Sequence, residues 1–556
     1  MHPISRTLRA LLSIGQSTGR TVLLTSLIIT AGLLVLRQAG TAVESLELSI
    51  WDRMTRLNPD DSADERLLVV GVTEQDIQKY GQPLPDDVLT RLLQALEAQQ
   101  PRAIGVDIIR DLPQGEGREN LLQMLQKTPN IISVCKVGVG EDAGYPPPPG
   151  VPKARLGFVN FPPDPGGVVR RQVLAMVPPS LSDEAESQLD EAKKNPCQDS
   201  SEPLFSLGFQ VAQQYLQGEG VSLNLTPNEE IQLGNVVFHP LLANSGGYQH
   251  ADTGGYQMLL RYRAPDHIAP QVTLDEVLTG QVRAEQVRDR IVLIGYVAES
   301  VHDLFPTPFS AGQRDNQPMP GVVIHAQLTS QVLSAVLEGK PLPWFWPQGV
   351  EMAWIWVWAL AGGVLAGAVR HPLGLGAGTL AALGLCTGSG YFAFLLAGWI
   401  PVGTPVLAFV TTLGGVILVD RYAQTITKQI KGFLNLDIDI DEVEKETAVA
   451  EITESDYFQK LQESGEKLRK QKGDIEGIPE GAKPASNNST KSSKLRSTSR
   501  RDILGELQQA SSTPNEPPAS NPAPAAAEPT PSAGEGSLDD FFLSFQDQSE
   551  DTHDAH

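Results

Sequence analysis

The chain has 556 residues, a length that allows about three or four domains. Its formal net charge of -23 argues against general nucleic-acid binding, because duplex affinity comes mainly from Lys and Arg side chains that neutralise phosphates. The three cysteines have no CxxC or Cys/His spacing, so the sequence predicts no metal site and no cofactor. Cys135 and Cys197 form a disulfide if their segment is exported, and the alternative is that Cys135 is a buried thiol on a strand.

The first apolar run is "TVLLTSLIITAGLLVL", residues 21–36, between Arg20 and Arg37. It is shorter than the roughly 20 residues that cross a bilayer as a helix. It reaches that length if Arg37 extends its side chain to the interface and the helix continues past it. We predict a cytoplasmic N-terminus at 1–20 and a transmembrane helix at 21–42. A signal peptide cleaved near Ala42 is the alternative, and either one exports the segment that follows.

Residues 43–343 are expected to form the exported domain. The segment 85–100 begins with Pro85 and Asp86 and carries apolar residues on one helical face, namely Val88, Leu89, Leu92, Leu93 and Leu96. Buried strands precede and follow it, and this strand–helix–strand order predicts parallel pairing. We therefore expect an α/β domain with a mixed sheet. Its strands are expected at 66–72, 102–108, 130–139, 168–177, 235–240, 256–263 and 290–295, with a last helix at 322–339.

Five stretches of this domain carry a family resemblance. They are "LLVVGVTEQDIQKYG", "LLQALEAQQPRAIGVDI", "GFVNFPPDPGGVVRR", "IVLIGYVAESVHDLFPTPFS" and "MPGVVIHAQL". Their order resembles type-2 CHASE domains, which are extracellular sensory domains of bacterial cyclases, histidine kinases and Ser/Thr kinases. The resemblance implies a bacterial receptor whose exported domain reads an external cue, and it leaves the identity of that cue open.

The positions that match the family's motifs include several polar residues. Asp107 ends a strand, and Asp303 follows the strand that ends at Gly295, so both carboxylates are expected at the carboxyl edge of the sheet, where α/β folds place ligands. Asn160, Asp164, Gly167, Thr307 and Pro308 also match. The ligand-binding candidates we select are Asp107, Arg170, Arg171, Asp303 and His325.

Each of these candidates also has a structural alternative. Arg170 and Arg171 point to opposite faces of a strand, so at most one is expected to reach a given site, and the inward one can pair with Asp107 or Asp303. His325 can be an ordinary core residue of its helix. No GxSxG elbow or HExxH motif is present, so we predict no catalytic residues and no enzyme.

Three more apolar spans follow, at 352–369, 372–399 and 400–419. Arg370 lies between the first two of them, Arg421, Lys428 and Lys431 follow the last, and Arg6, Arg9 and Arg20 precede the span at 21–42. Lys and Arg stay cytoplasmic, so the N-terminus and the tail are expected inside and residues 43–343 outside the bacterial inner membrane. Six of the seven Trp lie between Trp344 and Trp399, which is typical of an interfacial aromatic belt.

The tail contains no P-loop and no protein-kinase motifs. We predict helical structure over 420–473 and a disordered segment over 474–556, because its Ser, Asn, Pro and Ala cannot bury enough apolar surface. A short helix at 537–546 places four apolar residues on one face as a partner-binding motif, namely Leu538, Phe541, Phe542 and Phe545. The sequence thus predicts a membrane sensor or adaptor, with a homodimer as an open possibility. A structural envelope protein that tethers a wall or membrane component is the alternative.

Overall fold

The computed structural model describes residues 4–40, 42–57, 62–140, 142–180, 195–264, 268–310 and 318–433, together with Lys460, Glu463, Ser464 and Lys467, which are helical. The described residues up to Ala423 belong to one compact unit, and the described residues from Gln424 onward belong to a second. The predicted disordered segment at 474–556, and with it the helix at 537–546, lies outside the described residues.

A six-stranded sheet forms the centre of the α/β domain, in the order β11-β1-β12-β2-β3-β4, and every neighbouring pair in it is parallel. The strands are nearly continuous apolar runs because helices cover both faces. Their bounds are β1 Leu67–Val72, β2 Ala103–Asp107, β3 Ile131–Cys135, β4 Leu156–Phe158, β11 Gln271–Thr273 and β12 Ile291–Tyr296.

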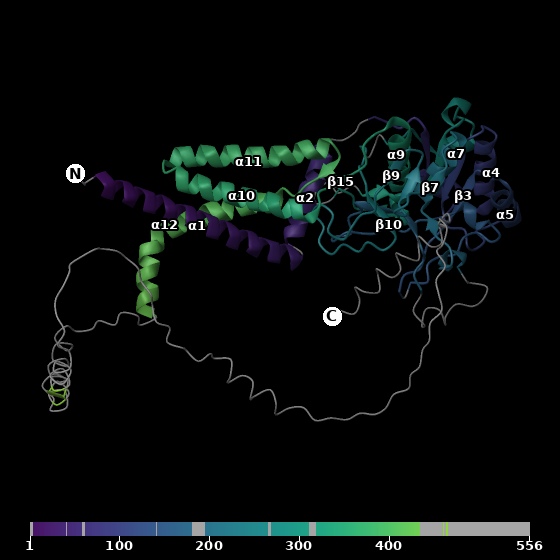
Figure 1. Cartoon of the computed structure of the whole chain (residues 1–556). Coiled ribbons are helices and arrows are strands. Elements are labelled where there is room, and N and C mark those ends of the chain that lie inside the picture. The colour runs from purple at the N-terminus through teal and green to yellow at the C-terminus, as the bar shows by residue number, and fades with distance from the viewer. Residues whose placement is uncertain are drawn as a thin grey trace, which may run out of the picture. The chain divides into compact units, whose positions relative to one another are not determined.

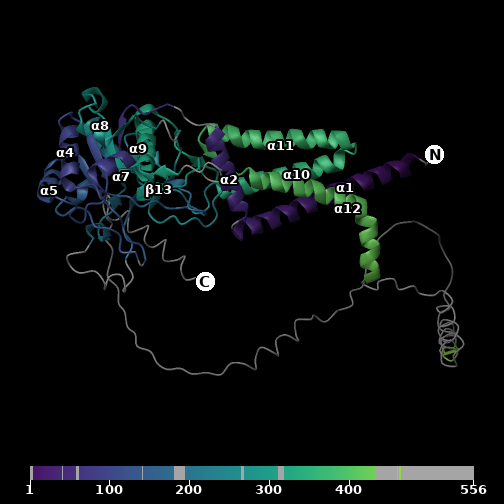
Figure 2. The same cartoon turned by 180° about the vertical axis from the view of Figure 1, so that it is seen from behind.

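Two hydrophobic clusters cover the two faces of this sheet. One contains residues of α4 Asp86–Glu97, α5 Arg118–Lys127 and α8 Leu274–Leu278, and the other contains residues of α7 Leu207–Gly218 and α9 Gly321–Glu338. Figures 1 and 2 show α4 and α5 on the side of the sheet away from α9. The five apolar residues predicted to line one face of α4 are all buried, as the periodicity indicated. A short helix, α3 Glu74–Tyr80, follows β1 behind a Thr73–Asp76 capping box.

The antiparallel strands lie in separate small sheets. One sheet has the order β10-β5-β6, and a second has the order β7-β8-β9. The predicted α/β class is confirmed, with parallel and antiparallel pairing divided between sheets. The bounds are β5 Arg171–Met176, β6 Leu204–Phe205, β7 Leu223–Leu225, β8 Ile231–Leu233, β9 Val236–Phe238 and β10 Tyr256–Leu259, and the pair β13 Leu304–Phe305 and β14 Met319–Pro320.

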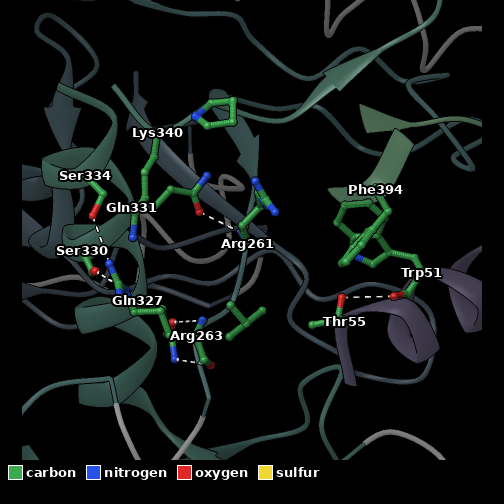
Figure 3. Close-up of a pocket in the computed structure, with 12 residues that line it drawn as sticks. Trp51, Thr55, Arg261, Arg263, Gln327, Ser330, Gln331, Ser334, Lys340 and Phe394 are labelled. Carbon is green, nitrogen blue, oxygen red and sulfur yellow. Dashed lines mark hydrogen bonds between the residues drawn. The ribbon is translucent and has the colours of Figure 1, made fainter. Parts of the chain in front are cut away.

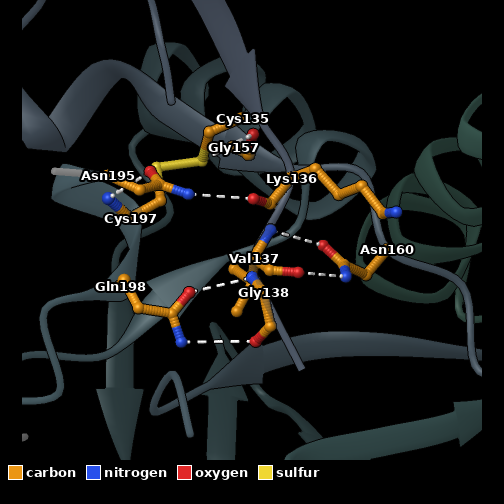
Figure 4. The surroundings of a disulfide bond; sticks show 9 residues. All are labelled: Cys135, Lys136, Val137, Gly138, Gly157, Asn160, Asn195, Cys197 and Gln198. Atoms are coloured by element: carbon orange, nitrogen blue, oxygen red, sulfur yellow. Dashed lines mark hydrogen bonds between the residues drawn. A yellow bond between two sulfur atoms is a disulfide. The ribbon is translucent and has the colours of Figure 1, made fainter. Parts of the chain in front are cut away.

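Cys135 and Cys197 form a disulfide, with their Cα atoms 6.5 Å apart. Cys135 ends β3, and Cys197 lies in a short 3-10 turn, Pro196–Gln198. Figure 4 shows how amide side chains extend the same attachment: Gln198 Oε1 accepts from the backbone N–H of Gly138 at 2.8 Å, and Asn195 Nδ2 donates to Lys136 O at 3.0 Å. The disulfide therefore secures a segment that is distant in sequence to the end of the central sheet.

Four helices are long and apolar enough to cross a membrane, with candidate spans at Gly19–Gln38, Gln348–Ala368, Pro372–Leu395 and Gly403–Asp420. They belong to α1 Ile4–Gln38, α10 Gln348–Ala368, α11 Pro372–Leu395 and α12 Gly403–Phe433, which agrees with the predicted spans to within a few residues. Small residues let them approach closely. A Cβ at Gly362 would overlap Phe409 O, and one at Gly363 would lie 2.9 Å from Val22.

The first helix ends differently from the prediction. It stops at Gln38, short of the expected limit at residue 42, because Gly40 takes a positive φ of 97°. A separate helix, α2 Ala42–Leu57, follows. Arg37 lies at the end of the apolar run, and the extension of its side chain to the membrane interface stays a prediction. Its buried guanidinium lies 2.6 Å from Glu351 of α10 and donates to Gly246 O at 2.8 Å.

Candidate functional site

The predicted carboxylate pair forms at the carboxyl edge of the central sheet. Asp107 is the last residue of β2, and Asp303 follows β12. Burial and the nearby charge of Asp303 raise the pKa of Asp107 well above its ordinary value, and burial raises the pKa of Asp303 as well. Gly321, the first residue of α9, leaves space for the carboxylate of Asp303. A Cβ at this position would lie 3.0 Å from one of the carboxylate oxygens.

His325 lies one turn further along α9 and is completely buried. Its ring packs on Phe161 at 4.8 Å between centroids, and Phe161 packs edge-on against Phe305 at 4.8 Å. Neither ring nitrogen has a hydrogen-bond partner among the described residues. Burial lowers the pKa of His325 to about 3, so the imidazole is neutral at physiological pH. His325 therefore lies in the core of the domain, and its role toward a ligand stays a prediction.

Arg170 and Arg171 form the centre of a buried ion-pair network with Asp164. Arg170 Nη1 donates to Asp164 Oδ2 at 3.1 Å, and Arg171 Nε donates to Asp164 Oδ1 at 2.8 Å. The expectation that only one of the two arginines reaches a given site is wrong. β5 begins only at Arg171, so Arg170 precedes the regular pleat and is not bound by strand alternation. Neither arginine pairs with Asp107 or Asp303.

The other matched positions have structural roles. Asn160 exchanges two hydrogen bonds with the backbone of Val137, at 2.9 and 2.8 Å (Figure 4). Gly167 takes a positive φ of 75° in the turn that follows Asp164. The buried backbone N–H of Thr307 donates to Ser310 Oγ at 2.9 Å. Pro308 O accepts a hydrogen bond from Arg56, a residue of α2.

The network extends to α2 through Asp52. Arg170 Nε and Nη2 donate to the two carboxylate oxygens of Asp52 at 2.7 and 2.8 Å, and both side chains are 5 % exposed. Burial alone would lower the pKa of Arg170, but its bonds and attraction to Asp52 hold that pKa above its usual value. A bidentate ion pair of this kind fixes the relative orientation of its two side chains as well as their distance. The α/β domain therefore holds α2 in a defined position.

The same helix binds the start of α12 through Glu47. Glu47 Oε2 accepts from the backbone N–H of Val402 at 3.0 Å and of Gly403 at 3.2 Å. Glu47 Oε1 accepts from the N–H of Thr404 at 2.7 Å and from its hydroxyl at 2.8 Å. A carboxylate in this position satisfies the unpaired amides of the first helical turn and favours the positive end of the helix dipole.

An aromatic cluster fills the space between these two attachments. Trp51 of α2 packs on Trp399 at 4.9 Å and edge-on against Phe394 of α11 at 5.0 Å. Tyr248 of the α/β domain packs edge-on against Trp399 at 5.2 Å and donates to Asp164 at 2.7 Å. Trp399 lies in β16 Gly398–Trp399, which pairs with β15 Trp344–Phe345 before α10. We call Glu47, Trp51, Asp52, Arg170 and Trp399 the junction.

Sequence reasoning missed the α2 side of the junction. Leu48, Trp51 and Met54 recur at intervals of three, a helical signal that was present in the sequence. Trp51 is also the only Trp outside the predicted aromatic belt, and the structure brings it to Trp399 of that belt. Among the described residues, no group of three His, Cys, Asp or Glu side chains lies close enough together to hold a metal ion.

These features define a multi-pass membrane protein whose α/β domain is bonded to its membrane helices through the short helix α2 and through direct contacts such as that of Arg37 with Gly246 O. The family model of the CHASE2 domain matches residues 26–364, which is more than half of the chain. The chain therefore belongs to the CHASE2 domain family, as the resemblance of its five motifs indicated. Comparison with curated proteins and with solved structures found no match.

Proposed function

We propose that this protein is a bacterial inner-membrane sensor and adaptor. Its CHASE2 domain reads a cue outside the cytoplasm, and its tail recruits a cytoplasmic protein instead of carrying a catalytic output. The disulfide between Cys135 and Cys197 supports the exported position of the domain, because such bonds persist mainly in oxidising compartments. The Lys and Arg residues beside the spans support a cytoplasmic tail.

The observation that carries this proposal is the double attachment of α2. One turn of this helix binds Arg170 of the CHASE2 domain through Asp52, and the preceding turn binds the first amides of α12 through Glu47. Since α12 continues as one helix from Gly403 to Phe433, a movement of α2 that changes this cap also changes a helix that reaches the tail. Repacking of buried ion pairs at an interface is one of the ways in which proteins pass a change from one part to another.

Hydrogen exchange of the full chain in lipid nanodiscs tests the transmission step. We expect Asp52→Asn to increase deuterium uptake at Val402, Gly403 and Thr404. The reason is that α2 loses its fixed position, which weakens the hydrogen bonds of these amides to Glu47. Asp289→Asn is the matched control, since Asp289 has an exposed side chain and a positive φ that Asn tolerates. Unchanged uptake in Asp52→Asn would exclude transmission through α2.

Recruitment is tested separately in cells. Tail-bound proteins are captured from cells that express the wild type, Glu47→Gln or Asp289→Asn. The sensor proposal predicts a different yield of the captured partner in Glu47→Gln only. A partner set that stays the same in all three strains favours the alternative, a structural envelope protein that uses its tail as a constant tether.

A further inference from the structure

A cleft of about 430 Å³ lies beside α7 in the CHASE2 domain, between this helix and the segments 153–156 and 202–205, and we call it the α7 cleft. Its volume is within the range of about 300–1,000 Å³ that is usual for small-molecule sites. Four glutamines of α7 line it, namely Gln210, Gln213, Gln214 and Gln217. Their spacing places them on one face of the helix, and Val211 and Ala212 on the other side are fully buried in the core.

The glutamines of this cleft carry hydrogen-bonding groups that the fold does not use. Gln210 Nε2 donates to Ala154 O at 2.5 Å, but Gln210 Oε1 and Gln213 Oε1 have no hydrogen-bond partner among the described residues. An amide side chain offers two donors and two acceptor lone pairs, so both residues have capacity left for a ligand. Polar atoms that are enclosed without a partner are uncommon in proteins, and a binding role explains them here.

The cavity of about 330 Å³ beside the junction, drawn in Figure 3, is lined by glutamines that are already bonded. Gln327 Oε1 accepts from the backbone N–H of Arg263 at 2.8 Å, and Gln331 Oε1 accepts from that of Arg261 at 2.9 Å. Their side-chain amides also donate to backbone carbonyls, of Arg263 at 3.2 Å and of Leu259 at 3.1 Å. Those glutamines hold a neighbouring segment on α9, whereas the α7 cleft has amide groups to offer to a ligand.

The charged residues that line the α7 cleft have partners of their own. Lys153 Nζ lies 3.2 Å from a carboxylate oxygen of Glu202, which lines the same cleft. Arg155 Nη1 donates to Leu125 O at 2.6 Å and to Thr128 O at 2.7 Å, at the end of α5. A ligand in the cleft therefore meets amides rather than a free charged group. This favours a neutral ligand that is rich in hydroxyl or amide groups.

Phe205 adds an apolar surface to this polar lining. Its half-buried ring packs on Phe209 of α7 at 5.4 Å between centroids. Small-molecule sites typically combine aromatic side chains with a few placed polar groups. The C–H face of a sugar ring packs on an aromatic ring, and the substituents at its rim bond to amides. The groups that line the α7 cleft therefore match a saccharide.

An extended peptide fits this place less well. Peptides that bind by adding a strand to a sheet need a free strand edge. β4 is the last strand of the six-stranded sheet, but Phe158 in it pairs with Ser206. In addition, α7 begins directly against β4, since a Cβ at Gly157 would lie 2.7 Å from Leu207 Cα. The edge of β4 is therefore covered, and a compact ligand is favoured.

We propose that the α7 cleft binds a neutral mono- or disaccharide. Gln213 and Gln217 are its hydrogen-bonding contacts, and Phe205 is the surface on which a sugar ring packs. Half-buried Gln213 lies deeper in the cleft and exposed Gln217 lies nearer to solvent, so together they bond to two ends of such a ligand.

Binding is measured by isothermal titration calorimetry on the full chain in lipid nanodiscs, whose phospholipids carry no sugar. The probes are chitobiose, cellobiose and the peptide trialanine. The two disaccharides share one linkage and differ in their acetamido groups. We expect a saccharide to bind more tightly than trialanine. Gln213→Met with Gln217→Met should weaken its binding at least about tenfold, because two amide contacts are lost. Met is similar to Gln in length and helix propensity, and an unchanged melting temperature checks that the fold is intact.

The matched control is Gln94→Met with Gln123→Met, at exposed positions of α4 and α5 on the other face of the sheet. Tighter binding of chitobiose supports the proposal and assigns acetamido groups to the ligand. Equal or tighter binding of cellobiose supports it and assigns hydroxyl groups. The proposal is overturned if neither saccharide binds, if trialanine binds as tightly as the saccharides, or if the cleft variant and the control bind alike.

Only the role of the saccharide as the cue rests on the proposed function. α7 packs on α9, where Thr329 Oγ1 donates to Gly208 O at 3.0 Å, and α9 is followed by β15, which pairs with the strand of Trp399. The effect is read as deuterium uptake at residues 402–404 with and without the saccharide. Uptake that changes on binding supports both inferences. Binding without such a change keeps the saccharide site and excludes the saccharide as the cue, whereas Asp52→Asn judges transmission through α2, so the two proposals fail in distinguishable ways.

Discussion

At the scale of single residues, the carboxylates at the edge of the sheet and those beside the junction have different partners. Asp107 and Asp303 lie near each other with raised pKa values, whereas Asp164 accepts hydrogen bonds from Arg170, Arg171 and Tyr248. A buried carboxylate that is fully bonded fixes structure, and removing such a partner leaves uncompensated buried charges. Carboxylates held near each other in a buried site make the fold sensitive to pH.

Asp107 should reduce stability as the pH rises. Its pKa in the folded protein lies above the ordinary value of 3.8, so folding favours the protonated form, and this contribution is lost as the pH rises from about 4 through the raised pKa. We expect the melting temperature of Asp107→Asn to fall less than that of the wild type between pH 4.5 and 8. Asp289→Asn is the control. If the melting temperatures of the wild type and Asp107→Asn fall equally over this pH range, the charge of Asp107 does not destabilise the fold.

His325 should have the opposite effect. Its folded pKa of about 3 lies below the usual value of 6.5, so the neutral ring stabilises the fold above that value, and the contribution is lost as the pH falls from 6.5 toward 3. The loss amounts to about 1.4 kcal/mol per pH unit in this window. His325→Leu should therefore lose less stability between pH 7 and pH 5 than the wild type, as measured by thermal unfolding. An equal loss would mean that the ring is charged or bonded in the fold.

At the scale of elements, α2 connects parts of the chain that are far apart in sequence. Asp52 and Arg170 are 118 residues apart, and Glu47 and Thr404 are 357 apart. One short helix thus carries both contacts. Between the two contacts, Leu48, Trp51 and Met54 of α2 pack in one buried cluster with Trp399 and Phe394.

The contribution of Glu47 to the contact between α2 and α12 can be measured as a change in the free energy of unfolding. Glu47→Ala leaves the buried amides of Val402, Gly403 and Thr404 without their acceptor, which should cost about 1–3 kcal/mol of the free energy of unfolding. Glu47→Gln keeps one acceptor oxygen and should cost less. Unfolding of the full chain in sodium dodecyl sulfate measures both. Glu285→Ala, at an exposed position, is the control, and a loss equal to that of Glu285→Ala would show that Glu47 does not cap α12.

Local patterns account for what could be predicted from the sequence. β1, α4 and β2 follow from continuous apolar runs and a helical stripe, signals that lie within one element each. The pairing of Asp107 with Asp303 was predictable because parallel strands bring their carboxyl ends to one edge. The partners of Arg170 were not predictable, because Asp52 lies on a helix whose position depends on packing against Trp399 and Phe394, more than 300 residues away.

At the scale of the whole molecule, two tryptophans and the exposed Arg370 lie at opposite ends of the membrane spans. Trp344 and Trp399 lie at the ends that face the CHASE2 domain, together with the buried pair of Arg37 and Glu351. Arg370 lies in the turn between α10 and α11 at the other end. An arginine that is buried and paired does not set orientation as exposed ones do, so Arg37 does not contradict a cytoplasmic N-terminus.

This asymmetry predicts the orientation of the chain in the membrane. Fusions of alkaline phosphatase, which needs an oxidising compartment, should be active after Gly220 and after Ala397. Fusions of a fluorescent reporter that folds in the cytoplasm should be active after Arg370 and after Lys431. The physical reason is that Arg370, Arg421, Lys428 and Lys431 resist translocation, while the link between α11 and α12 carries no charge. Ala397 and Arg370 form the sharpest comparison, because α11 is the only long helix between them. If both behave alike, α11 does not cross the membrane, and if all four fusions are reversed, the CHASE2 domain is cytoplasmic and cannot read an external cue.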